Sequence, residues 1–465
     1  MERIKPMRGR LILLAAVFVL MALPACKSHT DVRKDFMHAL RYGQYPQAEQ
    51  VLIKTGGKDK DNLLADFMDR GMVLHYLGKY EESNIWLDKA DVLMEDQFTK
   101  HVSDALAAIA WNDTAAPYEG EEFERVMVNM VMAMNYIMLD KYEDAMVEVR
   151  KVNHKLALYA DKLAKNEIKN YTYKVDAFAN YLGGLISEAM REDNDALVSY
   201  RDALKGYDQF QKNYGVGCPP LLKADMLRQA KFMGLTEEYE KLSTEFGQLD
   251  EMQARYCEGK GELVVLVGTG RVAHKISKKW ITNDGQGDSI AVTYPEFTDS
   301  KFDAGFATVR INNYQVRSQI VTSLSAIAKK NLSDRNAEVK GKAIARAIAM
   351  YVAKKATRAA AKSDNTAVAV LGFLANTAMN VKDAVEVADT RSWVALPDSY
   401  QMVRMWLEPG KHAVNVDINS KMGYPLYTQN YTIDIAKGAK KFIIVNAPDR
   451  KPQMTSAKLK PVAKR

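Results

Sequence analysis

A cysteine close to the N-terminus has the surroundings of a lipid-modification site. Cys26 follows Leu23-Pro24-Ala25, and small residues directly before a cysteine are what bacterial lipoprotein processing requires. In that chemistry the thiol takes a diacylglycerol, the chain is cut before the cysteine, and the new amine is usually acylated, for example with palmitate. Several acyl chains on one residue anchor a protein stably, because each buried methylene contributes about 0.8 kcal/mol. We therefore predict that Cys26 is lipidated.

The segment before this cysteine has the three-part layout of a secretory signal peptide. Residues 1–10 are basic and residues 11–23 form an unbroken apolar run. As a transmembrane helix this run would span only about 20 Å, whereas the hydrocarbon core measures roughly 30 Å. Lys27 follows the cysteine, whereas Asp there is the inner-membrane retention signal of enterobacterial lipoproteins. The sequence thus predicts a signal peptide over residues 1–25 and a lipid-anchored protein of the bacterial cell envelope, in the outer membrane and facing the periplasm.

Two further cysteines, Cys218 and Cys257, would then lie in an oxidising compartment. A disulfide between them is one interpretation, since periplasmic proteins retain such bridges. Two independent small core residues are the other interpretation, and the sequence does not decide between the two.

The sequence contains no complete catalytic or metal-binding pattern. The seven histidines are dispersed without an HExxH arrangement, and no GxxxxGK[ST] or GxGxxG loop for phosphate occurs. Residues 287–289 (Gly-Asp-Ser) lack the GxSxG context of an esterase. Residues 363–365 and 54–56 match strings of penicillin-recognising enzymes, but the Ser-x-x-Lys nucleophile is missing. We expect no catalytic residue, metal or cofactor; an envelope hydrolase using dispersed carboxylates such as Asp288 and Glu296 is the less favoured alternative.

The elements that carry these residues begin with a long helical region. From about residue 31 to 247, small residues and tyrosines recur with the spacing of tetratricopeptide repeats, each a helix, a tight turn and a second helix. Small side chains are needed where the two helices cross closely, and the tyrosine after the turn covers the junction. The sequence predicts a TPR-like all-α superhelix over residues 26–250, with an irregular helical bundle as the alternative. The predicted packing residues are Gly71, Gly78, Tyr80, Ala90, Tyr142, Ala145, Gly184, Ala196, Tyr200 and Ala203.

After the helical region the apolar pattern changes to that of β-strands. The expected strands cover residues 262–267, 289–294, 307–311, 314–321, 400–407, 413–418, 427–433 and 441–446. We expect them to form one antiparallel β-sandwich domain from residues 258–322 and 389–447. An Ala-rich helical unit, residues 323–388, is inserted between the two strand groups, and a basic flexible tail covers residues 448–465. The fold class is therefore α+β multidomain, with the helical superhelix followed by a β-sandwich that carries an inserted α-helical hairpin.

The inserted unit is strongly basic. Residues 329–362 carry ten basic side chains against two acidic ones. The net charge of +7 and the pI of 8.9 therefore come from local segments and do not indicate nucleic-acid binding. We expect residues 337–362 and 366–387 to form an antiparallel hairpin with a basic outer face. Phosphate-bearing lipid is one ligand for that face, but an ordinary solvated surface is the favoured interpretation.

The chain resembles an uncharacterised family of bacterial tetratricopeptide envelope lipoproteins in three strings, at residues 118–125, 261–267 and 388–397. The most specific string is Asp389, Thr390, Arg391, Ser392 and Trp393. In this chain Gly268-Thr269-Gly270 replaces the Asn-Gly usual after the strand. The resemblance implies an architecture and an envelope location, but no established activity. Lipoproteins similar to penicillin-binding-protein activators are often encoded beside its relatives, which points weakly to cell-wall assembly.

Within the most specific string, Arg391 has two interpretations. It is either a recognition arginine or the partner of Asp389 or a neighbouring carboxylate in an internal ion pair. In the second interpretation, which we favour, a buried Trp393 holds the inserted helices against the sheet.

The expected function is a non-enzymatic scaffold for protein–protein interaction. Concave repeat surfaces bind extended or helical segments, so the partner would be an envelope protein of unknown identity. The membrane would be contacted through the N-terminal lipid, nucleic acid is not expected, and homo-oligomers remain open. The alternative is an oligomeric secretion or export accessory lipoprotein.

Overall fold

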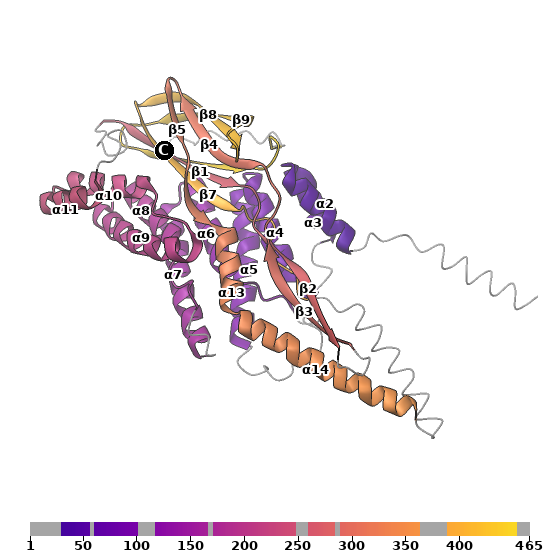
Figure 1. Cartoon of the computed structure of the whole chain (residues 1–465). Coiled ribbons are helices and arrows are strands. Elements are labelled where there is room, and N and C mark those ends of the chain that lie inside the picture. The colour runs from indigo at the N-terminus through magenta and orange to yellow at the C-terminus, as the bar shows by residue number, and fades with distance from the viewer. Residues whose placement is uncertain are drawn as a thin grey trace, which may run out of the picture.

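The computed structural model describes residues 29–55, 60–100, 117–165, 171–247, 259–283, 289–362 and 388–452 (Figure 1). Several predictions lie outside the described residues. These are the signal peptide with Cys26, the partner cysteine Cys257, the carboxylate Asp288, the expected helix over residues 366–387, and the tail beyond residue 452.

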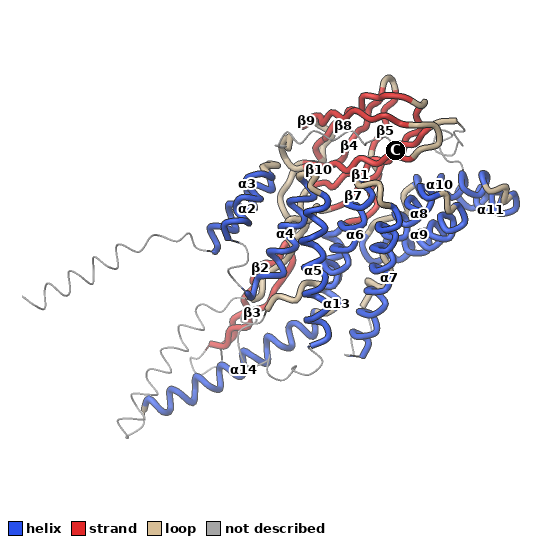
Figure 2. Tube along the Cα trace, turned by 180° about the vertical axis from the view of Figure 1, so that it is seen from behind, coloured by secondary structure: helices blue, strands red, loops and turns tan. Residues whose placement is uncertain are grey.

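The first half of the described chain consists of antiparallel helix pairs stacked side by side (Figures 1 and 2). Each pair is joined by a tight turn in which one residue has a left-handed conformation, with φ between 56° and 73°: Gly43, Gly78, Asp140, Arg191 and Gly234. This repeated turn ends one helix and reverses the chain into the next. The pairs are α2 (His29–Arg41) with α3 (Tyr45–Thr55), α4 (Leu63–Tyr76) with α5 (Tyr80–Lys100), α6 (Glu122–Met138) with α7 (Tyr142–Lys165), α8 (Ala177–Met190) with α9 (Asp193–Tyr214), and α10 (Pro220–Phe232) with α11 (Thr236–Phe246); a short 3₁₀ turn, η1 (Lys60–Asn62), precedes α4.

The strands form two four-stranded sheets and one two-stranded ribbon. The first sheet has the order β10-β1-β7-β6, from β10 (Lys440–Ala447), β1 (Gly261–Thr269), β7 (Ser399–Leu407) and β6 (Gln319–Ser323). The second has the order β5-β4-β8-β9, from β5 (Tyr314–Arg317), β4 (Ala304–Ile311), β8 (Gly410–Ser420) and β9 (Pro425–Ile435). The ribbon consists of β2 (His274–Asn283) and β3 (Ser289–Thr298).

The expectation of purely antiparallel strands is wrong at one edge of the first sheet. β10 pairs with β1 in parallel, from Glu262 opposite Lys440 to Thr269 opposite Ala447. The chain leaves β9, turns at residues 436–439, and enters β10 at the end of the sheet where β1 also begins. The Glu262 amide donates to the carbonyl of Ala439 there at 2.8 Å, so both strands run in the same direction.

Two further parts of the strand prediction differ from the structure. The strand β2 was not expected at all. The single strand expected over residues 314–321 is divided at Ser318 into β5 of the second sheet and β6 of the first. At that corner the Ser318 hydroxyl accepts from the Ala307 amide at 2.9 Å and donates to the Gln401 side chain at 2.5 Å. Side-chain hydrogen bonds thus satisfy the backbone where the chain changes sheets.

The first sheet is buried on both faces. Alternate residues of a strand point to opposite faces, so Leu263, Val265 and Val267 pack with β4 and β8 of the second sheet. Val264 and Leu266 belong instead to the apolar core that contains the helix pairs. This explains the unbroken apolar run of β1, because both sides of that strand meet protein. The helical part and the first sheet therefore share one core.

An arm projects from this body (Figures 1 and 2). We define the arm as the ribbon β2–β3 together with the helix α14 (Asn336–Ala361), which packs on β3. A shorter helix, α13 (Leu324–Asp334), connects β6 to α14 and packs against α6 and α9. Among the described residues no helix has the length and apolar character needed to cross a bilayer.

Candidate functional site

Six buried charged side chains meet where the helix pairs contact the first sheet. We call them the junction cluster: Glu188 on α8, Asp225 and Arg228 on α10, Glu262 on β1, Arg404 on β7 and Lys440 on β10. Three are acidic and three are basic, so the cluster is neutral as a whole.

Strand alternation explains why the sheet contributes three charges to this place. Successive residues of a strand point to opposite faces, and Val403, Met405 and Ile443 face the second sheet. Glu262, Arg404 and Lys440 occupy the alternate positions of their strands and therefore face the helices. The three strands are neighbours in the order β10-β1-β7. Their charged side chains therefore stand next to one another on the helix-facing surface.

Arg404 is the centre of the cluster. Its side chain is fully buried and pairs with Asp225, with Glu262 and, at 2.8 Å, with Glu188. Lys440 bridges Glu188 and Glu262 at 2.5 and 2.6 Å between Nζ and the carboxylate oxygens. Arg228 contacts Glu188 at 2.7 Å. Each charge thus has at least one opposite charge in direct contact, as buried charges require.

The electrostatics follow from these contacts. Burial alone would raise the pKa of Glu188 and Glu262, but the adjacent arginines and Lys440 hold both below their ordinary values. Asp225 differs, because burial raises its pKa despite Arg404 and Arg228. It also accepts a hydrogen bond from the Tyr181 hydroxyl at 2.5 Å.

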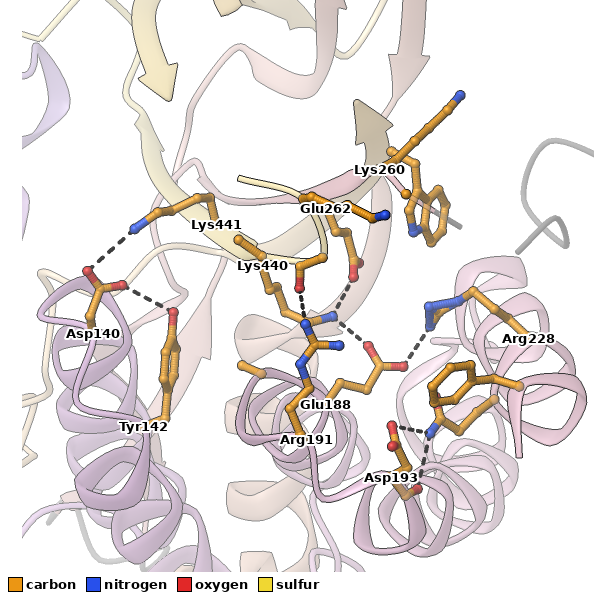
Figure 3. A pocket seen from close by; sticks show the side chains of 18 residues that line it. Asp140, Tyr142, Glu188, Arg191, Asp193, Arg228, Lys260, Glu262, Lys440 and Lys441 are labelled. Atoms are coloured by element: carbon orange, nitrogen blue, oxygen red, sulfur yellow. Dashed lines mark hydrogen bonds and ion pairs between the residues drawn. The ribbon is translucent and has the colours of Figure 1, made fainter. Parts of the chain in front are cut away.

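A cleft of about 600 Å³ opens beside the junction cluster (Figure 3). In Figure 3, Glu188 and Glu262 point toward Lys440 at its base. The outer lining contains four further cations against two further acids: Arg191, Lys260, Lys437 and Lys441 against Asp140 and Asp193. Three aromatic side chains complete the lining: Tyr142, Phe232 and Trp406. The cleft therefore combines a basic edge with apolar ring surfaces.

A second polar contact joins the helix pairs to the segment with the most specific string. The Glu124 carboxylate accepts from the Trp393 amide at 2.7 Å and from the Tyr118 hydroxyl at 2.6 Å. Asp69 accepts from the Ala395 amide at 3.2 Å, and Arg33 donates to the Ser392 carbonyl at 3.0 Å. Sequence reasoning missed both buried acids, which look like ordinary helix-surface charges.

Burial shifts the titration of these two acids. The pKa of Glu124 is raised from 4.5 to about 7 and that of Asp69 from 3.8 to about 7, in both cases mainly by desolvation. Both groups therefore take up a proton near neutral pH in the folded protein.

Arg391 and Trp393 lie inside the protein's own interactions. Arg391 contacts both carboxylate oxygens of Asp389, at 2.7 Å from Nη2 to Oδ2, and donates to the Asp61 carbonyl at 2.8 Å. Trp393 is completely buried, in the core that contains the helix pairs and residues of α13. Thr390 is exposed and Ser392 is buried beside it. The internal ion pair that we favoured for Arg391 is thus present, while the role of Trp393 in holding the inserted helices against the sheet stays a prediction.

The packing residues expected for the repeats lie at helix crossings and turns. A Cβ on Gly71 would come within 2.5 Å of Leu87, and one on Gly184 within 2.2 Å of the Tyr200 ring. The small or aromatic residues Ala90, Ala145, Ala196, Tyr200 and Ala203 are fully buried. Tyr80 stacks edge-on with His75, and Gly78 forms the left-handed turn. Tyr142 lies near Phe442 of β10 and lines the cleft.

The remaining candidate residues are dispersed. Cys218 is a partly buried free thiol whose pKa burial raises to about 12, and the pairing with Cys257 stays a prediction. Glu296 lies on β3, exposed and near Lys278. In the described part of the chain, no group of three or more His, Cys, Asp and Glu side chains is arranged to hold a metal ion.

Comparisons with known proteins returned only distant structural similarity. No family model matches the chain, and no match was found among curated proteins. Aspartyl phosphate phosphatase F from Bacillus subtilis is similar over 45% of this chain at 15% identity and a TM-score of 0.30, and the match spans 47% of the phosphatase, about half its length. MamA MSR-1 C2 is similar over 46% of this chain and 97% of its own, at 13% identity and a TM-score of 0.25. These scores are too low to carry an argument, so the function is argued from the site itself.

Proposed function

We propose that this chain is a non-enzymatic adaptor of the bacterial cell envelope that docks a segment of a partner protein in the cleft beside the junction cluster. The observation that carries the proposal is the lining of that cleft. A basic edge surrounds aromatic side chains, and the whole lies between a helix pair and a sheet that share one core.

The lining indicates an acidic partner segment with an apolar anchor. The outer cations outnumber the outer acids, so the local field favours a negatively charged ligand. Phe232 is about half exposed, and apolar side chains that enter such a pocket supply much of the energy of binding. Arg228 lies 5.1 Å and Arg404 5.6 Å from the centre of the Trp406 ring, which fixes that ring in the wall of the cleft.

A site-specific crosslink tests this docking site in cells. A photoreactive phenylalanine derivative replaces Phe232 in the cleft, and a matched derivative replaces Tyr424, which is exposed on a turn outside the cleft. We expect one envelope protein to be crosslinked from the Phe232 position and not from the Tyr424 position. The absence of any product specific to Phe232 would overturn the proposal.

Charge reversal identifies the chemistry of the interaction. The double variant Lys437→Glu and Lys441→Glu changes two cations of the cleft edge, whereas Lys205→Glu with Lys411→Glu changes two exposed lysines elsewhere. The first pair should abolish the crosslink from Phe232 and the second should leave it intact. A crosslink that survives the first pair would contradict an acidic ligand.

The location is part of the proposal and is tested separately. We propose an N-terminal lipid on Cys26, insertion in the outer membrane, a periplasm-facing body and a role in envelope assembly, with cell-wall assembly as one candidate process. The Cys26→Ser variant should lose labelling by radioactive palmitate and leave the outer-membrane fraction. A variant that stays labelled and membrane-bound would refute lipidation at this residue.

A further inference from the structure

The helix α14 of the arm has an apolar outer face that the ribbon does not cover. Its inner face packs on the ribbon, where Ala343 and Ala347 contact Val292. On the outer face Ile344, Ile348 and Val352 follow one another at intervals of four residues and are 43%, 50% and 59% exposed. Side chains four apart form one stripe along a helix, so these three make a continuous exposed apolar strip.

The same helix is strongly cationic. Residues 336–362 contain seven basic side chains and one acidic one, Glu338. Lys342, Lys355 and Lys362 are exposed, at both ends of the apolar strip. The ribbon adds exposed apolar side chains at Trp280 and Ile281. An apolar strip bordered by lysine and arginine is the composition of helices that lie in the surface of a bilayer.

The charge decides between two occupants of this face. A second copy of α14, in either orientation, would bring its exposed lysines near the exposed lysines of the first helix, and like charges at such distances repel. An anionic lipid surface has the complementary charge, and each lysine or arginine near it contributes about 1 kcal/mol.

The arm also begins near the chain's predicted anchor. The first described residue, His29, is three residues after Cys26, a reach of at most about 11 Å. On the same helix Arg33 contacts the Ser392 carbonyl, and four residues before Ser392 the Ala388 amide donates to Ser277 of β2 at 3.0 Å. The base of the arm is thus connected through a few residues to the helix that follows the lipidated cysteine.

We propose that the arm lies on the surface of an anionic bilayer, with the apolar strip of α14 in the headgroup region and its exposed lysines on lipid phosphates. This contact orients the body on the membrane in addition to the single N-terminal anchor. It does not depend on a partner in the cleft.

Vesicle flotation tests the proposal with the chain from Lys27 onward, which has no lipid and keeps every described residue. The probes are vesicles of phosphatidylcholine alone and vesicles in which about a third of the lipid is phosphatidylglycerol. We expect the protein to float with the anionic vesicles only, and binding to weaken as salt is raised.

Two sets of variants assign the binding to α14. Replacing Lys342, Lys355 and Lys362 by Gln should lower the partition coefficient on the order of 100-fold, since about 1 kcal/mol per cation is roughly fivefold each. Replacing Ile344, Ile348 and Val352 by Ser should also abolish flotation. The matched controls change side chains that are also exposed but lie outside the arm: Lys165, Lys205 and Lys212 to Gln, and Ile85, Val92 and Val198 to Ser. Circular dichroism confirms that each variant is folded.

Three results would overturn the proposal. The first is a wild-type protein that does not float with anionic vesicles, and the second is flotation that the α14 variants leave unchanged. The third is light scattering that shows a dimer in the wild type and a monomer in the serine variant, because the strip would then be an interface between copies of this chain.

Discussion

Replacement of Arg404 by Met tests whether the junction cluster holds the sheet on the helix pairs. Met has a similar length and no charge, so the change removes three ion pairs with little change in volume. Glu188 would keep Arg228 and Lys440, and Glu262 would keep Lys440. Asp225 would keep only Arg228, at 3.3 Å, and the Tyr181 hydroxyl. The change therefore leaves Asp225 the least compensated.

The expected loss of unfolding free energy at pH 7 is about 3–5 kcal/mol, the range for removing one partner of a buried pair. The loss should be smaller in acid. Without Arg404 the pKa of Asp225, already raised by burial, rises further. A carboxyl with a raised pKa in the folded state stabilises the protein below its unfolded pKa, and this stabilisation is lost as pH rises through the folded pKa. The variant should therefore lose stability as the pH is raised from 4 to 7.

The assay is urea unfolding followed by circular dichroism at several pH values. Arg201→Met is the control, since Arg201 and Glu238 form a bidentate pair between helices that is partly exposed, and it should cost at most about 1 kcal/mol. A double variant that adds Asp225→Asn should recover part of the loss, since no unpaired carboxylate remains. If Arg404→Met costs no more than Arg201→Met, the reasoning about the cluster is refuted.

Three further changes have definite expected outcomes. Gly184→Ala would place a Cβ 2.2 Å from the Tyr200 ring and should lower the free energy of unfolding by about 1–3 kcal/mol in thermal unfolding. The control Gly341→Ala, with no neighbour within 4 Å, should be neutral or slightly stabilising. Equal effects of the two changes would contradict the close crossing of α8 and α9. Protonation of Glu124 contributes stability that is lost as pH rises from 4.5 to 7, because its folded pKa is raised to about 7. The difference in unfolding free energy between the wild type and Glu124→Gln should therefore change by roughly 3 kcal/mol over this range, and a constant difference would show that the acid titrates normally. His75, whose pKa burial lowers to about 4, contributes a loss of stability as pH falls from 6.5 toward 4, so the unfolding free energy of His75→Gln should rise relative to that of the wild type as pH falls over this range.

Local patterns in the sequence were sufficient for the helix pairs and for most strands. The turn at Gly78 repeats in kind at Asp140 and Arg191, and the small residues Gly71 and Gly184 mark crossings because no larger side chain fits there. β1 was recognisable because a strand buried on both faces is apolar at every position. These features depend on residues close together in the chain.

The features that were missed depend on residues far apart. β2 contains Lys275, Lys278 and Lys279, and nothing in its own sequence alternates clearly between apolar and polar. It is a strand because β3 pairs along its whole length, while Lys275 is neutralised by Glu121 at 2.7 Å on α6. The parallel direction of β10 likewise follows from where the chain re-enters the sheet.

The junction cluster could not be found from spacing, because its members are separated by up to 252 residues, as in the pair Glu188 and Lys440. One local sign is Arg404, which stands in β7 between the apolar pairs Met402-Val403 and Met405-Trp406. Such a residue, fully buried, requires acids from other elements, so it predicts that partners exist without naming them.

The two polar contacts between the helical part and the sheet have a structural consequence beyond stability. Apolar packing is non-directional, so the core alone would let the sheet settle on the helix pairs in several orientations. The junction cluster fixes the sheet at α8 and α10, and Glu124 with Asp69 fixes the segment around Trp393 at α4 and α6. Two separate points of attachment define one orientation, since a shift at either would leave buried charges unpaired. The cleft beside the junction cluster is therefore already formed before a ligand arrives, and a partner segment that binds there need not order its walls.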